Sequence, residues 1–342
     1  MSHNTRRIEP VVIYNGVNIS SDLRPFLKGL SVTDNMAGQA DDLQITLEDK
    51  AGLWQSAWFP EKGATLSVSL ICNNWEKISG AYKLGTFEID EITSSGPPSE
   101  VQIKAVSVPD NNRLRGTERT RSWEKAELKR IANDIAKDAG LELVYDTTYN
   151  PVVDRAEQSQ ESDLYFLQHI LRDHGLALKI YENQIVIFDE ANYEQAIPNN
   201  TLLKPGNAEQ NIHVKSYSLK SQLRDIYKAC HVKYQNGKEH ELIEATFIAP
   251  DKTNGKTLEI NEQVKNLAEA ERLAKKRLRE KNCEEITGNF SLLGNPLLMA
   301  SSTIMLIGFG QYDGKYIITR AAHSIGSGYT TDIDIRRCLN GY

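Results

Sequence analysis

Cysteine is scarce in this sequence of 342 residues, and long apolar runs are missing. The four cysteines lie far apart and form no CxxC pair: Cys72, Cys230, Cys283 and Cys338. This spacing excludes a disulfide framework and a zinc knuckle, and it fits a chain made in a reducing cytoplasm. The apolar stretch before Asn15-Gly16 is too short for the core of a signal peptide. Runs such as Thr303–Ile307 fall far below a membrane span, so we expect no membrane partner.

A strong charge of either sign is also missing. Lysine and arginine number 40 against 46 acidic residues, which gives a formal net charge of -6. This mildly acidic balance argues against a chain that coats DNA or an anionic membrane, so we expect no direct recognition of nucleic acid. Hydrophobic residues make up 40% of the chain, enough to build a packed core.

Catalytic motifs are absent as well, because no HExxH, GxSxG or Walker-type loop occurs. The glycine-rich run Gly308–Gly314 precedes a predicted strand rather than a helix, so a hairpin turn is favoured over a phosphate loop. His169 and His174 are five residues apart on one predicted helix and cannot share a metal as an i, i+4 pair can. Asp332 and Asp334 share one side of a strand, which is typical of a solvated face. We therefore predict no enzyme, with no catalytic, cofactor-binding or metal-binding residues.

Residues 1–112 have the pattern of antiparallel β-structure. Val11–Ile13 and Val17–Ile19 flank an Asn15-Gly16 turn, which is the strongest short hairpin signal in a sequence. Further alternating segments carry one apolar and one polar face: Leu43–Leu47, Leu66–Leu70, Phe87–Ile89 and Val101–Ile103. Between them, residues 51–58 have room only for a short helical segment.

Residues 113–200 have the pattern of a small α/β module. One helix is predicted from about Trp123 to Ala139, with Ser122 as its N-cap and Gly140 just past its end. A second helix begins near Ser162–Asp163, followed by two short strands. Asp163 either complements the positive end of this helix or is a buried acid, and the first role is favoured.

Residues 201–342 return to β-structure after a polar linker predicted at 197–211. One long helix, at about 262–281, interrupts the strands. A faint internal repeat relates the two β regions: Gly63–Leu70 leads to Gly80–Tyr82 much as Ala300–Leu306 leads to Gly314–Tyr316. This similarity suggests a duplicated domain.

Two groups of residues are candidates for interfaces. Lys275, Lys276, Arg277 and Arg279 lie at the basic end of the predicted long helix, where most such runs are a solvated face that complements the helix dipole. A docking surface for an acidic neighbour is the sharper alternative. Trp54, Trp58 and Phe59 cluster near a turn, where core packing competes with a role in an interface.

Several segments, in order, resemble the phage late control protein D family, the baseplate hub proteins of contractile tails. The most specific is the run Gln160–Leu167 with the trailing Gly175. The other matching segments are listed here in chain order: Trp123, Leu128–Ala132, Ala139–Leu141, Gly294–Leu297, Gly308–Gly310, Asp313–Tyr316, His323 and Gly328–Thr331. The resemblance is weakest over the first 110 residues.

The resemblance implies a mainly β fold with α+β insertions, in which two tail-tube-like antiparallel β-barrels are joined by the small α/β module. It implies a homotrimer that adapts a hexameric tail tube to a trimeric central spike. The expected partners are further copies of the chain, the trimeric tail spike protein, the tail tube protein and other baseplate proteins. No cofactor is implied. The expected location is a virion or tail-like particle assembled in the bacterial host cytoplasm.

An alternative class remains open, in which the chain is a cell-wall-binding or peptidoglycan-degrading tail component. No segment looks long enough for a fused lytic domain, and the middle module is only loosely like a small wall-binding element. Relatives in type VI secretion continue into a spike, whereas this sequence stops at Tyr342, so the spike is expected to be a separate polypeptide.

Overall fold

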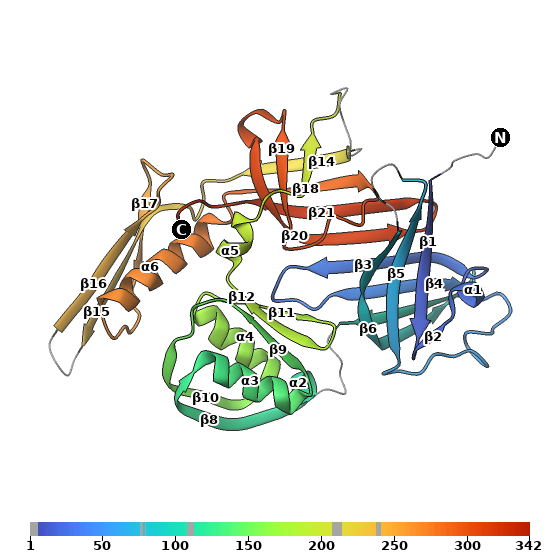
Figure 1. The fold of residues 1–342 in the computed structure, drawn as a ribbon, viewed down its shortest axis with the longest axis horizontal. Coiled ribbons are helices and arrows are strands. Elements are labelled where there is room, and N and C mark those ends of the chain that lie inside the picture. Colours follow the sequence, from blue (N-terminus) through green and yellow to red (C-terminus); the bar gives the residue numbers. More distant parts are fainter. Residues whose placement is uncertain (1–5, 76–77, 79, 108–112, 207–213, 237–240) are drawn as a thin grey trace. The chain divides into compact units, whose positions relative to one another are not determined.

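The computed structural model describes residues 6–75, 78, 80–107, 113–206, 214–236 and 241–342 (Figure 1). The predicted mainly β fold is confirmed, with most strands paired antiparallel. The described residues contain no closed barrel. By internal contacts the chain divides into unit 1 (Met1–Glu190, Ser291–Ser301 and Thr319–Ile333) and unit 2 (Ala191–Phe290, Ser302–Ile318 and Asp334–Tyr342). The three-part division at 112 and 200 stays a prediction, and position 112 lies outside the described residues.

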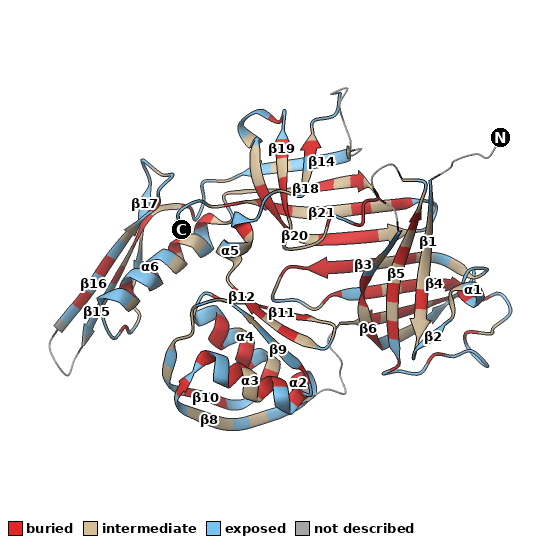
Figure 2. Cartoon of the chain, in the orientation of Figure 1, coloured by how far each residue is buried: buried red, intermediate tan, exposed pale blue. Residues whose placement is uncertain are grey.

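Unit 1 contains an antiparallel sheet with the strand order β3-β4-β7-β6-β5-β1-β2. Strands β4, β5 and β7 alternate buried with less buried side chains, as expected for a sheet with one face against a core. Their bounds are β1 (Arg7–Tyr14), β2 (Val17–Asn18), β3 (Leu27–Asn35), β4 (Asp42–Glu48), β5 (Thr65–Asn73), β6 (Gly80–Ser95) and β7 (Glu100–Val106), with the helix α1 (Ser20–Leu23) before β3. Figure 2 shows the resulting alternation of buried and exposed positions.

The predicted hairpin at Asn15-Gly16 is confirmed. Strands β1 and β2 pair antiparallel through Ile13↔Asn18 and Tyr14↔Val17. Asn15 and Gly16 have φ angles of 46° and 84°. Two successive positive φ angles match the twist of the flanking strands, which is why Asn-Gly favours this turn.

Strand β1 has one open edge over most of its length. Residues 7–14 all pair with β5, whereas only Ile13 and Tyr14 pair with β2. On the open side, the N–H of Val12 donates to Ser20 Oγ at 2.9 Å. Since backbone groups alternate in direction along a strand, Pro10 lies on the same edge as Val12. Proline offers no N–H there, so this edge has lost a donor.

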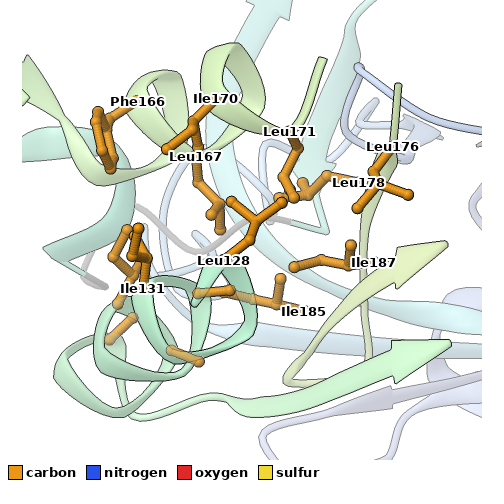
Figure 3. Packing of buried hydrophobic residues seen from close by; sticks show 14 of the residues in the cluster. Leu128, Ile131, Phe166, Leu167, Ile170, Leu171, Leu176, Leu178, Ile185 and Ile187 are labelled. Atoms are coloured by element: carbon orange, nitrogen blue, oxygen red, sulfur yellow. The ribbon is translucent and has the colours of Figure 1, made fainter. Parts of the chain in front are cut away.

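Unit 1 also contains the small α/β module. Its elements are α2 (Arg113–Gly116), β8 (Glu118–Glu127), α3 (Leu128–Ala139), β9 (Glu142–Asp146), β10 (Val152–Ser162), α4 (Asp163–Asp173), β11 (Ala177–Tyr181) and β12 (Gln184–Phe188). Figure 3 shows Leu128 and Ile131 of α3 and Leu167 and Leu171 of α4 turned toward each other and toward Ile185 of β12. All the buried members of this apolar cluster lie between Leu114 and Ile187.

The predicted start of the first module helix is wrong. Ser122 and Trp123 lie in strand β8, where Trp123 pairs with Ala156 of β10. Helix α3 begins only at Leu128, whose N–H donates to the carbonyl of Pro151 at 3.0 Å. Its first turn is therefore completed by a segment more than twenty residues away, which local spacing does not reveal. The predicted end is right, because Gly140 adopts the left-handed conformation with φ of 71°.

Unit 2 contains a second group of strands and the longest helix. Its elements are α5 (Glu190–Gln195), β13 (Asn200–Leu203), β14 (Val214–Ser221), β15 (Tyr227–Asn236), β16 (Glu241–Ile248), β17 (Lys256–Ile260), α6 (Leu267–Asn282) and β19 (Thr303–Ile307). Three further strands have residues in both units: β18 (Ile286–Leu293), β20 (Gly314–Ile325) and β21 (Tyr329–Arg337). Helix α6 packs against β15 and β16, as Figure 1 shows.

Three other local predictions need correction. The long helix begins at Leu267, not near 262, because Asn266 Oδ1 accepts the N–H of Glu269 and so caps it. The predicted linker at 197–211 contains β13, which pairs in parallel with β19, while 207–211 lies outside the described residues. Residues 51–58 form turns, not a helical segment.

The two halves of the suspected repeat both form antiparallel hairpins. Strand β5 pairs with β6, and β19 pairs with β20. The duplication itself stays a prediction, because hairpins of this kind are common in β proteins. The run Gly308–Gly314 lies in the second hairpin and leads into β20, as predicted for a turn.

Candidate functional site

The aromatic cluster, defined as Trp54, Trp58 and Phe59, lies in tight turns between β4 and β5. The buried carboxylate of Asp49 accepts the N–H of Trp54 at 3.1 Å. The N–H of Trp58 donates to the carbonyl of Leu53 at 2.9 Å, which folds the segment back on itself. These two hydrogen bonds bring the two tryptophan rings together without a helix.

The three rings of the cluster differ in exposure. Trp54 and Trp58 meet edge to face with centroids 5.4 Å apart, and Phe26 packs edge-on against both at 5.9 and 5.8 Å. Trp54 is only 6% exposed, whereas Trp58 and Phe59 are 44% and 53% exposed. Trp54 therefore packs in the core, whereas the rings of Trp58 and Phe59 are exposed and available to a partner.

A cavity of about 430 Å³ opens beside the aromatic cluster. Its wall is mainly apolar and includes Ile45, Leu66 and Ile89 from the strands of unit 1. Asp22 is the only charged residue in this wall. The volume lies in the range of about 300–1,000 Å³ typical of ligand pockets. An apolar cavity with two exposed aromatic rings at its border has the character of a binding site.

The basic end of α6, defined as Lys275, Lys276, Arg277 and Arg279, belongs to unit 2 and forms a separate candidate. Lys275 is exposed, and its ammonium lies 5.7 Å from the ring centre of Phe247. Lys276 Nζ is 3.7 Å from Glu280 Oε1, in an i, i+4 pair along the helix. Of these two lysines, only Lys275 keeps an exposed side chain.

The two arginines of this group bind acids of their own unit. Arg277 Nη2 lies 2.8 Å from Glu262 Oε1, and its Nη1 lies 3.1 Å from Glu280 Oε2. Arg279 contacts the buried carboxylate of Glu194. These contacts pair both arginines with acids of unit 2, so they support a role for both arginines in stabilising unit 2. A role in an external interface stays a prediction.

Glu194 of α5 is the centre of a buried ionic group that the sequence did not reveal. Its Oε1 contacts both Arg279 and Arg336, and its Oε2 accepts the N–H of Leu339 at 2.8 Å. Glu194 is 3% exposed. Its partners come from α6, β21 and the segment after β21, and sequence distances of 85 to 145 residues hide this pairing.

A second buried ionic group joins β3 and β11 in unit 1. Lys179 Nζ contacts Asp34, donates to the carbonyl of Asn35 at 2.7 Å and lies 3.3 Å from Asp41 Oδ2. Burial raises the pKa of Asp41 to about 6, although the ammonium of Lys179 opposes this shift. The group fixes the module to the sheet of unit 1.

Asp163 is fully buried, so the alternative of a buried acid was the better one. Its Oδ1 accepts from Arg121 Nη2 at 2.7 Å and from Gln158 Nε2 at 2.8 Å. The predicted start of the helix near Ser162–Asp163 is confirmed, and Ser162 is its cap, because its Oγ accepts the N–H of Tyr165 at 3.3 Å. The run Gln160–Leu167 thus contains both a helix cap and a buried ion pair.

The other polar residues considered from the sequence do not assemble into a catalytic group. His169 Nε2 lies 3.1 Å from Asp173 Oδ2, and His174 Nδ1 lies 3.4 Å from the hydroxyl of Tyr149. Within the described ranges, no group of three or more His, Cys, Asp or Glu side chains is arranged to hold a metal ion. Over the same ranges, no helix is both long and apolar enough to cross a membrane.

Comparison with known proteins identifies the family. The model of the phage tail baseplate hub (GPD) family matches residues 89–329, well over half of the chain. The chain therefore belongs to the phage tail baseplate hub family. The predicted resemblance is confirmed by this match.

A curated relative and two solved structures agree with this assignment. A probable baseplate hub protein of Escherichia phage 186 is 30% identical over 173 residues, 50% of this chain and 42% of that protein. A tail protein from Neisseria meningitidis MC58 has the same fold, with a TM-score of 0.72 at 13% identity over 96% of both chains. The E. coli c3393 protein, a component of the type VI secretion system, matches with a TM-score of 0.57 at 12% identity, over 99% of this chain and 78% of that one. The chain thus matches about two fifths of the length of the phage 186 protein.

Proposed function

We propose that this chain is a structural baseplate hub of a contractile tail, which adapts a hexameric tail tube to a trimeric central spike. The observation that carries the proposal is the family match over residues 89–329. The fold supports it, because a tail protein aligns with almost the whole chain at a TM-score of 0.72. In this role the chain acts by its shape and its contacts, without catalysis.

The proposed assembly is a homotrimer in a virion or tail-like particle. Two similar β regions per chain, if they derive from a duplication, give six similar domains in a three-fold ring. Such a ring offers nearly equivalent surfaces to a six-fold tube and keeps true three-fold symmetry for the spike. Closed rotational symmetry also limits the assembly to a finite size. Other baseplate proteins would then attach around this ring.

Native mass spectrometry of the chain co-expressed with the trimeric spike protein of the same particle tests the proposal. We expect complexes with three hub copies per spike trimer. The isolated chain is expected to be monomeric in dilute solution if the spike is needed to close the ring. A stable complex with two, four or six hub copies would contradict the adaptor function.

A further inference from the structure

The cavity beside the aromatic cluster is lined almost entirely by apolar and aromatic side chains, and Asp22 is the one charged residue in its wall. Asp22 has no ion-pair partner in the described part of the chain. The site therefore fits an apolar group accompanied by a positive charge.

The chain itself exposes a loop with this chemistry, residues 222–225 between β14 and β15. Leu223 is 84% exposed. The next residue, Arg224, has a side chain that is 93% exposed and lies only near its neighbour Asp225, at 3.7 Å. Among the large exposed hydrophobic residues that the structure describes, Leu223 alone is followed directly by a base. The loop offers an apolar side chain and a cation in two consecutive residues.

We propose that the cavity beside the aromatic cluster receives the loop 222–225 of a second copy of this chain. Leu223 enters the apolar cavity against Trp58 and Phe59, and Arg224 pairs with Asp22. This inference deepens the proposed function and rests on its homotrimer, for which it names the contact between copies.

The two surfaces are different, so the contact is heterologous. Each copy donates a loop to one neighbour and receives a loop from the other, and a closed ring results when the rotation completes a circle. The occupant is chosen by complementarity of charge and polarity, since a single acid borders the cavity and a single base follows the exposed leucine. Aromatic rings around such a pocket are typical of the residues that dominate binding energy.

Photo-cross-linking in the full-length hub–spike complex tests the contact directly. A benzoylphenylalanine placed at Phe59, which is 53% exposed, should give a covalent hub dimer. The cross-linked peptide should contain Leu223. A cross-link to the spike, to another segment, or within one chain would overturn the proposal.

Charge reversal provides the second test. Asp22→Lys and Arg224→Glu should each weaken the ring about tenfold, and the double variant should restore it. Leu223→Ser should also weaken it, and its high exposure means that folding is unaffected. Arg155→Glu, at another exposed arginine, is the matched control and should leave the copy number unchanged.

The two proposals fail in different ways. If the unmodified chain gives no three-copy complex, the proposed function fails and this contact with it. If three copies persist in both Leu223→Ser and Asp22→Lys, the proposed function stands and only the contact is wrong. Mixing the Asp22→Lys and Arg224→Glu variants adds a further check. Alternating copies of the two variants pair opposite charges at every contact only in a ring with an even number of subunits. A three-copy ring of the mixture therefore keeps at least one contact between like charges.

Discussion

Glu194 is a single carboxylate that joins three segments of unit 2 through Arg279, Arg336 and the N–H of Leu339. A buried ion pair adds little net stability when compared with apolar packing, because both charges lose their hydration. Removing one partner of a buried ion pair, in contrast, lowers stability strongly, because the other charge stays buried without compensation. Removing Glu194 should therefore affect stability about as strongly as truncating a buried apolar side chain.

Replacing Glu194 with glutamine should lower the free energy of unfolding by about 3–5 kcal/mol, because Arg336 and the largely buried Arg279 would lose their ion pairs with this carboxylate. Chemical denaturation followed by circular dichroism measures this change. The control is Glu157→Gln, since Glu157 forms an exposed pair with Arg155 at 3.0 Å. The control should cost less than about 1 kcal/mol. Equal losses in the two variants would contradict the role of Glu194.

His323 should make the protein less stable in acid. It is fully buried, with Nδ1 2.8 Å from the hydroxyl of Tyr329, and burial lowers its pKa from about 6.5 to about 4. As the pH falls from about 6.5 to 4, the unfolded chain takes up a proton that the folded chain does not, so stability is lost by up to about 3 kcal/mol. Above about pH 6.5 His323 is neutral in both the folded and the unfolded chain, so its full contribution to the free energy of unfolding is present.

Melting temperatures measured from pH 7 to pH 4 test this linkage. The variant His323→Gln keeps a polar side chain but cannot titrate, so its melting temperature should fall less over this interval. Parallel curves for the two proteins would show that the acid sensitivity originates elsewhere.

At the scale of single elements, the sequence predicted what depends on neighbouring residues and missed what depends on distant ones. The Asn15-Gly16 turn and the start of α4 near Ser162–Asp163 rest on groups within a few residues, and both are confirmed. The start of α3 depends on Pro151 of a distant segment, so the prediction at Ser122 was wrong. Strand β3 was also missed; it pairs with the next strand, β4, and with the distant β20.

Helix α4 offers a way to separate a cap from a buried charge. Ser162→Ala removes the oxygen that accepts the N–H of Tyr165 and should cost about 1 kcal/mol. Asp163→Asn removes the buried partner of Arg121 and leaves it only the exposed carboxylate of Asp138, 2.7 Å from its Nη1, so it should cost about 3 kcal/mol. Urea unfolding of both variants gives the comparison. The reverse order would mean that the cap, not the ion pair, stabilises this helix.

Gly294 follows β18 where that strand ends beside Tyr329 of β21. A Cβ at this position would lie 2.0 Å from Cδ1 of the Tyr329 ring. Gly294→Ala should therefore lower the melting temperature strongly, at a cost of about 3 kcal/mol or more from overpacking. Gly328→Ala is the matched control, because a Cβ there meets nothing within 4 Å. Differential scanning calorimetry should find the control close to the unmodified protein.

At the scale of the whole molecule, composition and alternation were sufficient to predict a mainly β protein with a small α/β module. They were not sufficient for the division into units, because Ser291–Ser301 and Thr319–Ile333 join unit 1 from far along the chain. The aromatic cluster was predicted from the sequence. The cavity beside it was not, because the wall of the cavity comes from several strands. Contacts of this kind carry no local signal.

The α/β module should fold without the rest of the chain. All the buried members of its apolar cluster lie between Leu114 and Ile187. A fragment of residues 113–190 should therefore unfold cooperatively on heating, with a helical circular dichroism spectrum before the transition. A fragment without a cooperative transition would show that the module needs the sheet of unit 1, to which Lys179 connects it. Lys179→Met in the full chain would then reproduce part of that loss.

Pro10 on the open edge of β1 has a consequence for the time before assembly. A newly made copy that has not met its partners must remain dispersed at high local concentration, and an open strand edge is a template on which other chains pair and aggregate. Without an N–H at Pro10, and with that of Val12 already bound to Ser20, an incoming strand finds an incomplete row of donors. The edge thus limits uncontrolled pairing with the strands of other chains.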